Sequence, residues 1–520
     1  MAIINLQITS IMGGHSPLFH GAGEGQFISS LAIDPEASES LKPSGYILPV
    51  GYAKFSSSVP SGAPMWIVTN PVNQNHYVYG ADGELYSYDS VLSSETSIGT
   101  PTSGAGNGSA YYNDYVYLAT PTNVSRYGPL SGAAAIVNTA WTGATLGSQS
   151  ALTNSTYPGT RNVDYPNHAM HVHTDGSLYF LDFASGQGMV HKIKTDSTGT
   201  NDGSAYNVLD LPFGVRPFDL EGYGTDLAVV GSVLGSSTTV KQGGSFLFLW
   251  DTFADSFYRQ VPIPSAFASA IVNVGGTLYI WGGSIDFGWH LYRYTGGYDV
   301  EQLWDSHEGS PPYAGAVDTF GDRVAWGSYI TGTPSIAACI MAYGYQNERL
   351  GRDAVHNIGV VDSLNTLPVV SSLKFAQQAQ RTKAPIIGWR TDTSAAYGLS
   401  KVSAAAAKNS WFWSPPFQVN KPFKVREIRI PLTDPVTSTV NIRPRIMFDD
   451  QGTTKTLTAI NNTNYPGESV VRYNDLEIEE ATSAGYVGKN NFFLELQWDA
   501  GTSAIGVALP IDITIETLDD

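Results

Sequence analysis

The segment from Ser269 to Trp304 constrains the fold more than any other part of the chain, because it reads as four short strands in succession. Its apolar and aromatic runs are separated by the glycine pairs Gly275-Gly276, Gly282-Gly283 and Gly296-Gly297. Short strands rich in Tyr, Trp, Val and Ile and bounded by such pairs are typical of antiparallel hairpins. One four-stranded sheet cannot cover both of its own faces, so the unit requires neighbours of the same kind.

Related units recur along the chain. A turn followed by an apolar core is found at residues 113–117, 175–179, 224–228, 275–279 and 321–325, with a related hairpin at 80–86 and a degenerate copy at 384–390. The mean spacing is about 50 residues, the length of a kelch-type propeller blade. We therefore predict an all-β fold with a β-propeller of about seven blades. Six or eight blades remain open, and a large β-sandwich or a β-helix are the alternatives. The expected blades span residues 64–100, 106–150, 167–213, 215–264, 267–308, 312–363 and 367–400.

The regions on either side of the repeats have different patterns of apolar and polar residues. Residues 1–60 contain apolar pieces separated by Gly, Pro and acidic residues, which predicts an extended N-terminal arm that docks on another surface. Residues 406–520 contain about seven longer strands with alternating patterns, which predicts a β-sandwich or jelly-roll-like domain. The β-propeller is expected between them, at 61–405. The best helix candidates are Leu373 to Lys383 and, more weakly, Ala404 to Lys408.

Composition narrows the possible partners. The chain has 520 residues and a formal net charge of −18, and a chain this acidic is a poor candidate for neutralising nucleic-acid phosphates. Its single cysteine, Cys339, lies in an apolar run, so it is expected to be a buried small hydrophobe. No apolar run approaches the roughly 20 residues of a membrane span. The N-terminus has no basic region before an apolar core, so we expect no secretion signal and folding in a reducing cytoplasm.

Few residues suggest chemistry. His168, His171 and His173 form the densest histidine cluster; on a strand, His171 and His173 would share one face and could bind a metal, but no third ligand is apparent nearby. The alternative interpretation is a set of polar residues at an exposed or inter-blade position. Asp219 and Glu221 share a strand face and could serve as a glycosidase pair, although a surface pair is the commoner meaning.

The segment from Asp449 to Gly452 could bind calcium, but it reads first as a turn between strands. Sequence motifs of zinc proteases, serine hydrolases, P-loops and sialidase Asp boxes do not occur. We therefore predict no catalytic, cofactor-binding or metal-binding residues, no cofactor, and a protein that is not an enzyme.

The leader, with Gly13-Gly14 and the piece GQFISSLAIDPEAS, precedes divergent blades in a low-charge chain rich in Gly, Ser, Thr and Tyr. In these features residues 10–400 resemble the β-propeller tail proteins of tailed bacteriophages, of the nozzle or tail-hub type. The resemblance implies a structural virion protein, assembled in the host cytoplasm as a ring-shaped homo-oligomer, often sixfold, around the DNA exit channel. It implies other tail proteins (adaptor, fibre or spike) as partners and no sequence-specific binding of nucleic acid. The C-terminal sandwich is not a fixed part of that family's pattern.

Two other functions remain open at the level of sequence. A carbohydrate- or receptor-binding module would use Tyr and Trp side chains of the blade loops to stack on sugars, for example on a host surface glycan. A glycan-degrading propeller enzyme would need a catalytic carboxylate pair. Binding to a glycan array distinguishes the first from a purely structural role, and turnover of a polysaccharide would establish the second.

Overall fold

The computed structural model describes the chain in a series of ranges. These are residues 2–9, 14–15, 26–27, 29–31, 33–34, 46–49, 51–55, 62–90, 92–101, 106–121, 123–137, 168–193, 207–234, 240–284, 288–306, 311–330, 337–345, 353–360, 368–378, 381–391, 397–403, 410–419, 421–437, 440–448, 453–474, 478, 491–499 and 505–518. The chain forms two compact units, one made of residues 1–53, 339–362 and 402–520, and the other of residues 54–338 and 363–401. The first contains the sandwich and the second contains most of the propeller.

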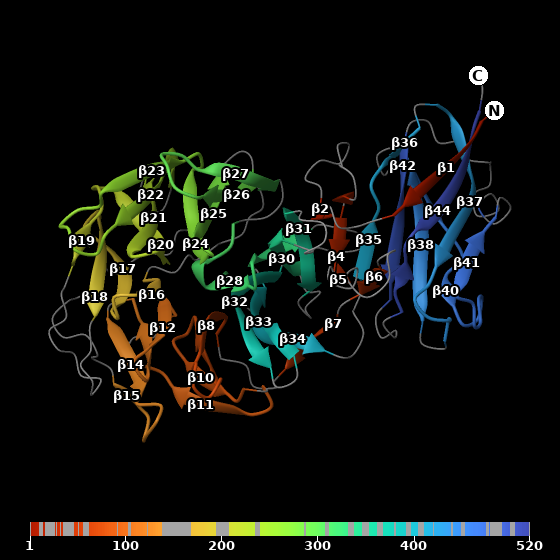
Figure 1. Cartoon of the computed structure of the whole chain (residues 1–520). Coiled ribbons are helices and arrows are strands. Elements are labelled where there is room, and N and C mark those ends of the chain that lie inside the picture. The colour runs from red at the N-terminus through yellow and green to blue at the C-terminus, as the bar shows by residue number, and fades with distance from the viewer. Residues whose placement is uncertain are drawn as a thin grey trace. The chain divides into compact units, whose positions relative to one another are not determined.

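Within the described residues, seven four-stranded sheets follow one another along the chain from β8 to β34 (Figure 1). The first three are β8 (Pro64–Thr69), β9 (His76–Gly80), β10 (Leu85–Tyr88) and β11 (Glu95–Gly99); β12 (Gly108–Tyr112), β13 (Tyr115–Ala119), β14 (Val124–Gly128) and β15 (Ala135–Val137); and β16 (Met170–Val172), β17 (Leu178–Ala184), β18 (Gln187–Ile193) and β19 (Leu209–Asp210). The next two are β20 (Val215–Tyr223), β21 (Asp226–Leu234), β22 (Val240–Trp250) and β23 (Arg259–Ile263); and β24 (Phe267–Val274), β25 (Thr277–Ser284), β26 (Gly288–Tyr294) and β27 (Glu301–Ser306).

The sixth sheet is β28 (Val317–Phe320), β29 (Arg323–Ile330), β30 (Ala337–Tyr345) and β31 (Asp353–Val360), preceded by the short 3-10 helix η2 (Ala314–Ala316). The seventh is β32 (Pro368–Gln378), β33 (Arg381–Thr391) and β34 (Tyr397–Ser403), completed by β7 (Gly51–Phe55) from the leader. The strands of each sheet follow chain order, except for β7. The structure thus confirms a propeller with seven blades.

The ring is closed by its innermost strands. Each first strand of a blade, from β8 through β12, β16, β20, β24 and β28 to β32, packs against the next, and β32 packs against β8. Polar bonds reinforce the closure, because the hydroxyls of Ser371 and Ser372 on β32 donate to the carbonyl of Pro64 on β8, at 2.5 and 2.9 Å. The strand β7 adds a second closure at the other side of the seventh sheet, since it pairs with β34.

Glycines set the hairpins that the sequence pattern predicts. In the β24–β25 turn, Gly275 and Gly276 have φ of 57° and 85°, a backbone region that side chains with a Cβ rarely adopt. The paired strands then place Leu278 and Ile280 in the core shared by blades four and five. The local sequence therefore fixes both the turn and the face that becomes buried.

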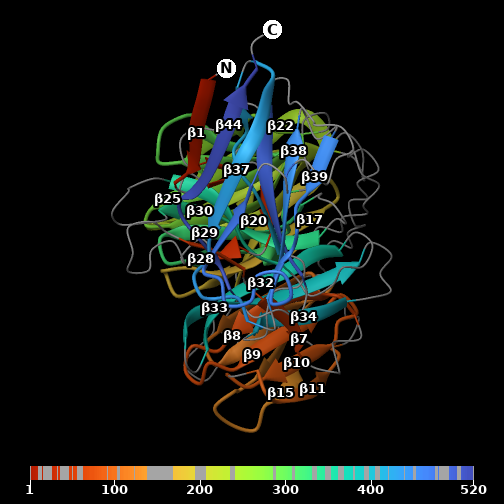
Figure 2. The same ribbon diagram turned by 90° about the vertical axis from the view of Figure 1, so that its right-hand side faces the viewer.

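The C-terminal region forms two sheets around a common core. Figure 2 shows β1, β44 and β37 side by side in one of these sheets. One sheet has the order β1-β44-β37-β41 and contains β1 (Ala2–Ile8), β44 (Ile511–Thr517), β37 (Phe423–Pro431) and β41 (Val470–Tyr473). The other has the order β39-β38-β42-β35-β4, with β39 (Thr453–Thr456), β38 (Asn441–Phe448), β42 (Asn491–Trp498), β35 (Ser410–Trp413) and β4 (Ser29–Leu31), and with β36 (Phe417–Gln418) and β40 (Ile460–Asn461) beside it. The predicted sandwich is confirmed.

Details of this sandwich follow the sequence pattern. The apolar alternation of β37 slips by one residue, and the structure has a register shift between Val425 and Glu427 at this point. This β-bulge keeps Val425 and Ile428 both in the core. On β42, Phe492, Leu494 and Leu496 share the core face, as predicted. The opposite face is also covered, since Glu495 is only 1% exposed.

The leader supplies strands to sheets formed by later parts of the chain. Besides β1, β4 and β7, it contributes β2 (Gly14–His15), β3 (Gln26–Phe27), β5 (Ile33–Asp34) and β6 (Tyr46–Pro49). The strand β6 pairs with both β5 and β43 (Val507–Ala508), and β2, β4 and β5 pack on β31. The predicted arm therefore docks on its own chain, and it forms no unit by itself.

The helix expected at Leu373 to Lys383 is wrong. Residues 373–378 form the end of β32 and residues 381–383 the start of β33, because Leu373 and Phe375 are needed in the propeller core and pair with β33. The second candidate helix lies outside the described residues. Within the described part of the chain, no helix is both long and apolar enough to cross a membrane.

Candidate functional site at the innermost strands of the propeller

The two carboxylates singled out in the sequence lie on β20, the innermost strand of blade four. Asp219 is buried, and its two carboxylate oxygens accept backbone N–H groups from Leu220 and, across to blade five, from Ile271, both at 2.9 Å. Burial raises the pKa of Asp219 to about 7, although these two hydrogen bonds oppose the shift. Because both oxygens are engaged by backbone groups, this carboxyl acts as a connector between blades.

Glu221 lies two residues further along the same face. Burial, and then the charge of Asp219, raise the pKa of Glu221 to about 8. Its Oε1 atom is 3.5 Å from Nδ1 of His171 on β16, the innermost strand of blade three. Burial, with a smaller effect of His173, lowers the pKa of His171 to about 4. Near pH 7 these shifts favour a protonated carboxyl facing a neutral imidazole, so the contact is a polar pair without net charge.

A second carboxylate connector lies between blades six and seven. Asp318 on β28 accepts the backbone N–H of Phe375 at 2.6 Å and the ammonium of Lys374 at 2.9 Å, both on β32. Burial lowers the pKa of Lys374, but the charge and hydrogen bond of Asp318 outweigh it, so the pKa lies above its usual value. The charge of Lys374 also acts on Glu221. Innermost strands of blades three, four, six and seven thus bring His171, Asp219, Glu221, Asp318 and Lys374 into one electrostatic cluster.

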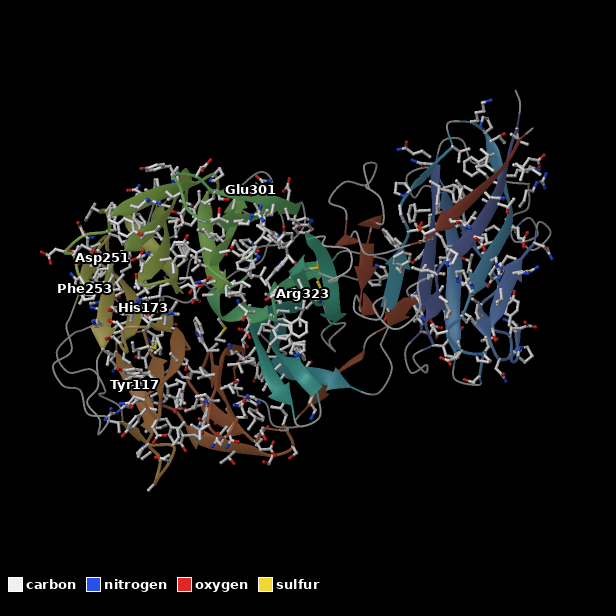
Figure 3. All side chains as sticks on the ribbon, in the orientation of Figure 1. Tyr117, His173, Asp251, Phe253, Glu301 and Arg323 are labelled. Atoms are coloured by element: carbon white, nitrogen blue, oxygen red, sulfur yellow. The ribbon has the colours of Figure 1, made fainter. Side chains whose placement is uncertain are left out.

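The other two predicted histidines are engaged separately. His173, which Figure 3 labels, uses Nε2 to donate to the carbonyl of Thr225 in blade four at 3.0 Å, while its buried Nδ1 has no hydrogen-bond partner among the residues that the structure describes. His168 is buried, with Nδ1 at 2.8 Å from the carbonyl of Leu181 and 3.6 Å from Asp182. His191 faces the same Asp182 at 3.3 Å. The cluster seen in the sequence therefore separates into two inter-strand networks.

The remaining candidates are the possible metal ligands, Cys339 and the segment proposed for calcium. Among the residues that the structure describes, no group of three or more His, Cys, Asp or Glu side chains is arranged to hold a metal ion. Cys339 is buried on β30, as expected. The segment proposed for calcium, Asp449 to Gly452, lies outside the described residues.

Sequence reasoning missed Asp318 and Lys374, which belong to segments 56 positions apart with no motif in common. One weak signal could have pointed to Asp318. It lies three residues before the turn at Gly321, and Glu221 lies three residues before the equivalent turn at Gly224. Lys374 could not be found this way, since its segment has the composition of a helix. Polar groups on innermost strands are fixed by ring closure, which the local sequence does not specify.

No protein-family model matches the chain, and no curated protein matches it. Solved structures with a similar fold include the computationally designed Ika8 protein, with 12% identity, a TM-score of 0.38, and coverage of 68% of this chain and 99% of that chain. The Dos1 propeller has 14% identity and a TM-score of 0.40, over 73% of this chain and 94% of that one. The Neurospora crassa Pan2 WD40 domain has 9% identity and a TM-score of 0.40, over 68% and 94%.

The seven blades and the closed ring of their innermost strands define the class of protein to which the architecture corresponds, a β-propeller protein. At this level of identity the similar solved structures say nothing about what this chain binds.

Proposed function

We propose that the chain is a structural protein of a bacteriophage tail, a component of a nozzle or hub ring that self-associates through its leader and C-terminal sandwich. The single observation that carries the proposal is the strand β1. It lies at the edge of its sheet, paired on one side with β44, and Ile3 is 75% exposed. An edge strand with an exposed large aliphatic residue is a template for strand addition by another chain.

Other features support a scaffold. The carboxylates on the innermost strands hold neighbouring blades together, and both oxygens of Asp219 are engaged by backbone groups. In this proposal the protein acts without catalysis and without a cofactor. The net charge of −18 suits a ring through which DNA slides, because like charge keeps phosphate from adhering. The resemblance of residues 10–400 to phage nozzle and hub proteins supports the choice of a phage tail as the particle in which the protein would assemble.

The edge strand offers a direct test of assembly. The variant Ile3→Lys places a charge on the open edge of β1, which natural sheets use to block strand addition. We expect the native chain to form a closed ring in mass photometry and Ile3→Lys to be monomeric with an unchanged melting temperature. Val72→Lys is the matched control, since Val72 is 83% exposed in the propeller, and it should still form rings.

The role in a virion needs a separate measurement. Particles should be purified from a lysate of infected host cells and probed with an antibody against the recombinant chain. The protein should co-sediment with intact tails. A chain that stays monomeric at tens of micromolar and is absent from the particles would exclude the proposal.

A carbohydrate- or receptor-binding function is the second candidate. It is favoured by aromatic side chains that the propeller leaves exposed on its turns, including Tyr258 and Tyr298.

A further inference from the structure

Four tyrosines, one arginine and one aspartate meet where blades four and five are neighbours. We name this group the tyrosine patch, and it comprises Tyr223, Asp226, Tyr258, Arg259, Tyr294 and Tyr298. They come from the β20–β21 turn, the start of β23 and the end of β26 with the turn that follows. In a four-stranded antiparallel blade the first and third turns lie at the same end, so these segments share one face of the propeller.

Arg259 is held in place by blade five. Its Nη1 atom donates to the hydroxyl of Tyr294 at 3.0 Å and to the carbonyl of Gly297 at 3.1 Å. The guanidinium carbon lies 5.8 Å from the ring centre of Tyr258 and 5.3 Å from that of Tyr298. The donors on Nε and Nη2 have no partner among the described residues. The arginine is therefore preorganised, with hydrogen-bond donors left over.

Two of the rings are open to solvent beside this arginine. Tyr298 is 80% exposed and Tyr258 is 51% exposed. Tyr298 follows Gly296 and Gly297, whose φ values of 115° and 110° form the turn that presents it. The hydroxyl of Tyr258 donates to Oδ2 of Asp226 at 2.6 Å, which fixes the ring and leaves Oδ1 as an acceptor. The patch thus offers ordered aromatic faces with a planar donor and a planar acceptor next to them.

This combination matches the chemistry of a sugar ring. A pyranose has an apolar face of C–H groups, which packs on an aromatic ring, and a rim of hydroxyls, each of which both donates and accepts. Tyrosine contributes a large contact area at little cost in side-chain entropy, because it has only two rotatable side-chain bonds. Asp226 adds a carboxylate and the chain is strongly acidic, so a polyanionic glycan is disfavoured. A stable protein partner would draw on about 20 to 30 residues a side, more than these three segments supply.

We propose that the tyrosine patch binds a neutral oligosaccharide, with Tyr298 as the stacking platform and Arg259 and Asp226 as hydrogen-bonding groups. This site deepens the second candidate function, and it does not depend on assembly into a tail.

The test uses the full-length protein and a defined set of probes. The chain is applied to an array of neutral hexasaccharides of glucose, N-acetylglucosamine, mannose and galactose, with heparin and polysialic acid as anionic comparators. Binding to the best neutral probe is then measured by calorimetry. Tyr298→Ala should weaken it about tenfold or more, since it removes the stacking surface. Tyr298→Trp should retain or strengthen binding, because it keeps an aromatic face.

Arg259→Lys keeps the charge but loses the planar fork, so it should also weaken binding. Phe253→Ala is the matched control, because Phe253 (Figure 3) is 87% exposed on the β22–β23 turn and should not affect binding. The proposal is overturned if no neutral probe binds, if only the anionic glycans bind, or if Tyr298→Ala binds as the native protein does. Monomeric or ring-forming behaviour in mass photometry reports separately on the tail proposal.

Discussion

The propeller and the sandwich use similar strands but connect them differently. In blade five the spatial order β24-β25-β26-β27 is the chain order, and each strand pairs with its neighbour through a short turn. In the sandwich, β1 pairs with β44, and Ala2 bonds to Thr517 across a separation of 515 residues. The blades are therefore specified locally, whereas the sandwich depends on contacts between distant parts of the chain.

This difference suggests how each region should respond to perturbation. A blade contributes to the fold as a whole repeat, because both of its neighbours need its sheet faces. The sandwich should instead be sensitive to single residues at positions far away in the sequence. The following predictions test the contrast, from the largest expected effect to the smallest.

Deleting residues 267–308, which contain blade five, should abolish cooperative folding of the propeller. The deletion exposes one face of blade four and one of blade six, and it breaks the closed ring. Gel filtration and thermal melting followed by circular dichroism should show aggregation or a loss of the transition. A soluble deletion variant with a cooperative melt would show that the ring need not be closed by seven blades.

Ile8→Ala should destabilise the sandwich by about 3 kcal/mol, a typical loss for a buried aliphatic side chain cut to Ala. Ile8 is 3% exposed and belongs to the sandwich core, although it lies in the leader. The shift is measured in chemical unfolding followed by tryptophan fluorescence. Ile3→Ala, at an exposed position of the same strand, should change stability by less than about 0.5 kcal/mol. Equal effects of the two changes would argue against the docking of β1.

Asp318→Ala should destabilise the propeller by about 2 kcal/mol. It leaves the backbone N–H of Phe375 and the ammonium of Lys374 without their acceptor, and the value is moderated because Lys374 is 36% exposed. Asp322→Ala is the control. Asp322 is exposed in the turn that follows β28, so this change should leave the free energy of unfolding nearly the same. An unfolding free energy unchanged in Asp318→Ala would show that the connector contributes nothing.

Asp219 and Glu221 should make the stability of the folded protein depend on pH. Their folded-state pKa values are raised to about 7 and 8, so the folded protein binds more protons than the unfolded chain above about pH 4. This contribution is complete below pH 4 and is lost as the pH rises through 7 to 8. The double variant Asp219→Asn with Glu221→Gln should flatten the slope of stability against pH between pH 5 and 7 by on the order of 1 kcal/mol per pH unit. Glu301→Gln, at an exposed glutamate, should leave the slope as it is.

The sequence predicted the parts of the fold that local chemistry determines. Glycine pairs such as Gly275-Gly276 marked the hairpins, and the expected blade ranges enclose all seven observed sheets apart from β7 and the last three residues of β34. Even the slip in the β37 pattern corresponded to a bulge at Arg426. These signals were readable because the partner of each strand is the next strand.

Pairing over long distances could not be predicted in the same way. The segment 373–383 has helix-forming Ala, Gln and Lys, but tertiary packing places Leu373 and Phe375 in a strand. The sequences of β1 and β44 do not show that these two strands pair, because a strand with alternating polarity can pair with many other strands. At the site, the face shared by Asp219 and Glu221 was predicted from alternation. The contact of Glu221 with His171 and its electrostatic interaction with Lys374 arise only from ring closure.

The pairing of β7 with β34 has a consequence for folding during translation. Residues 51–55 leave the exit tunnel long before residues 397–403 are made. At typical translation rates of about 5–20 residues per second, the gap is roughly 20 to 70 seconds. During that time the first blade has no neighbour on one side, and its apolar flank is open to chaperones. Synonymous codons that slow translation between these segments should therefore increase the need for a holdase, while slow codons after residue 403 should not.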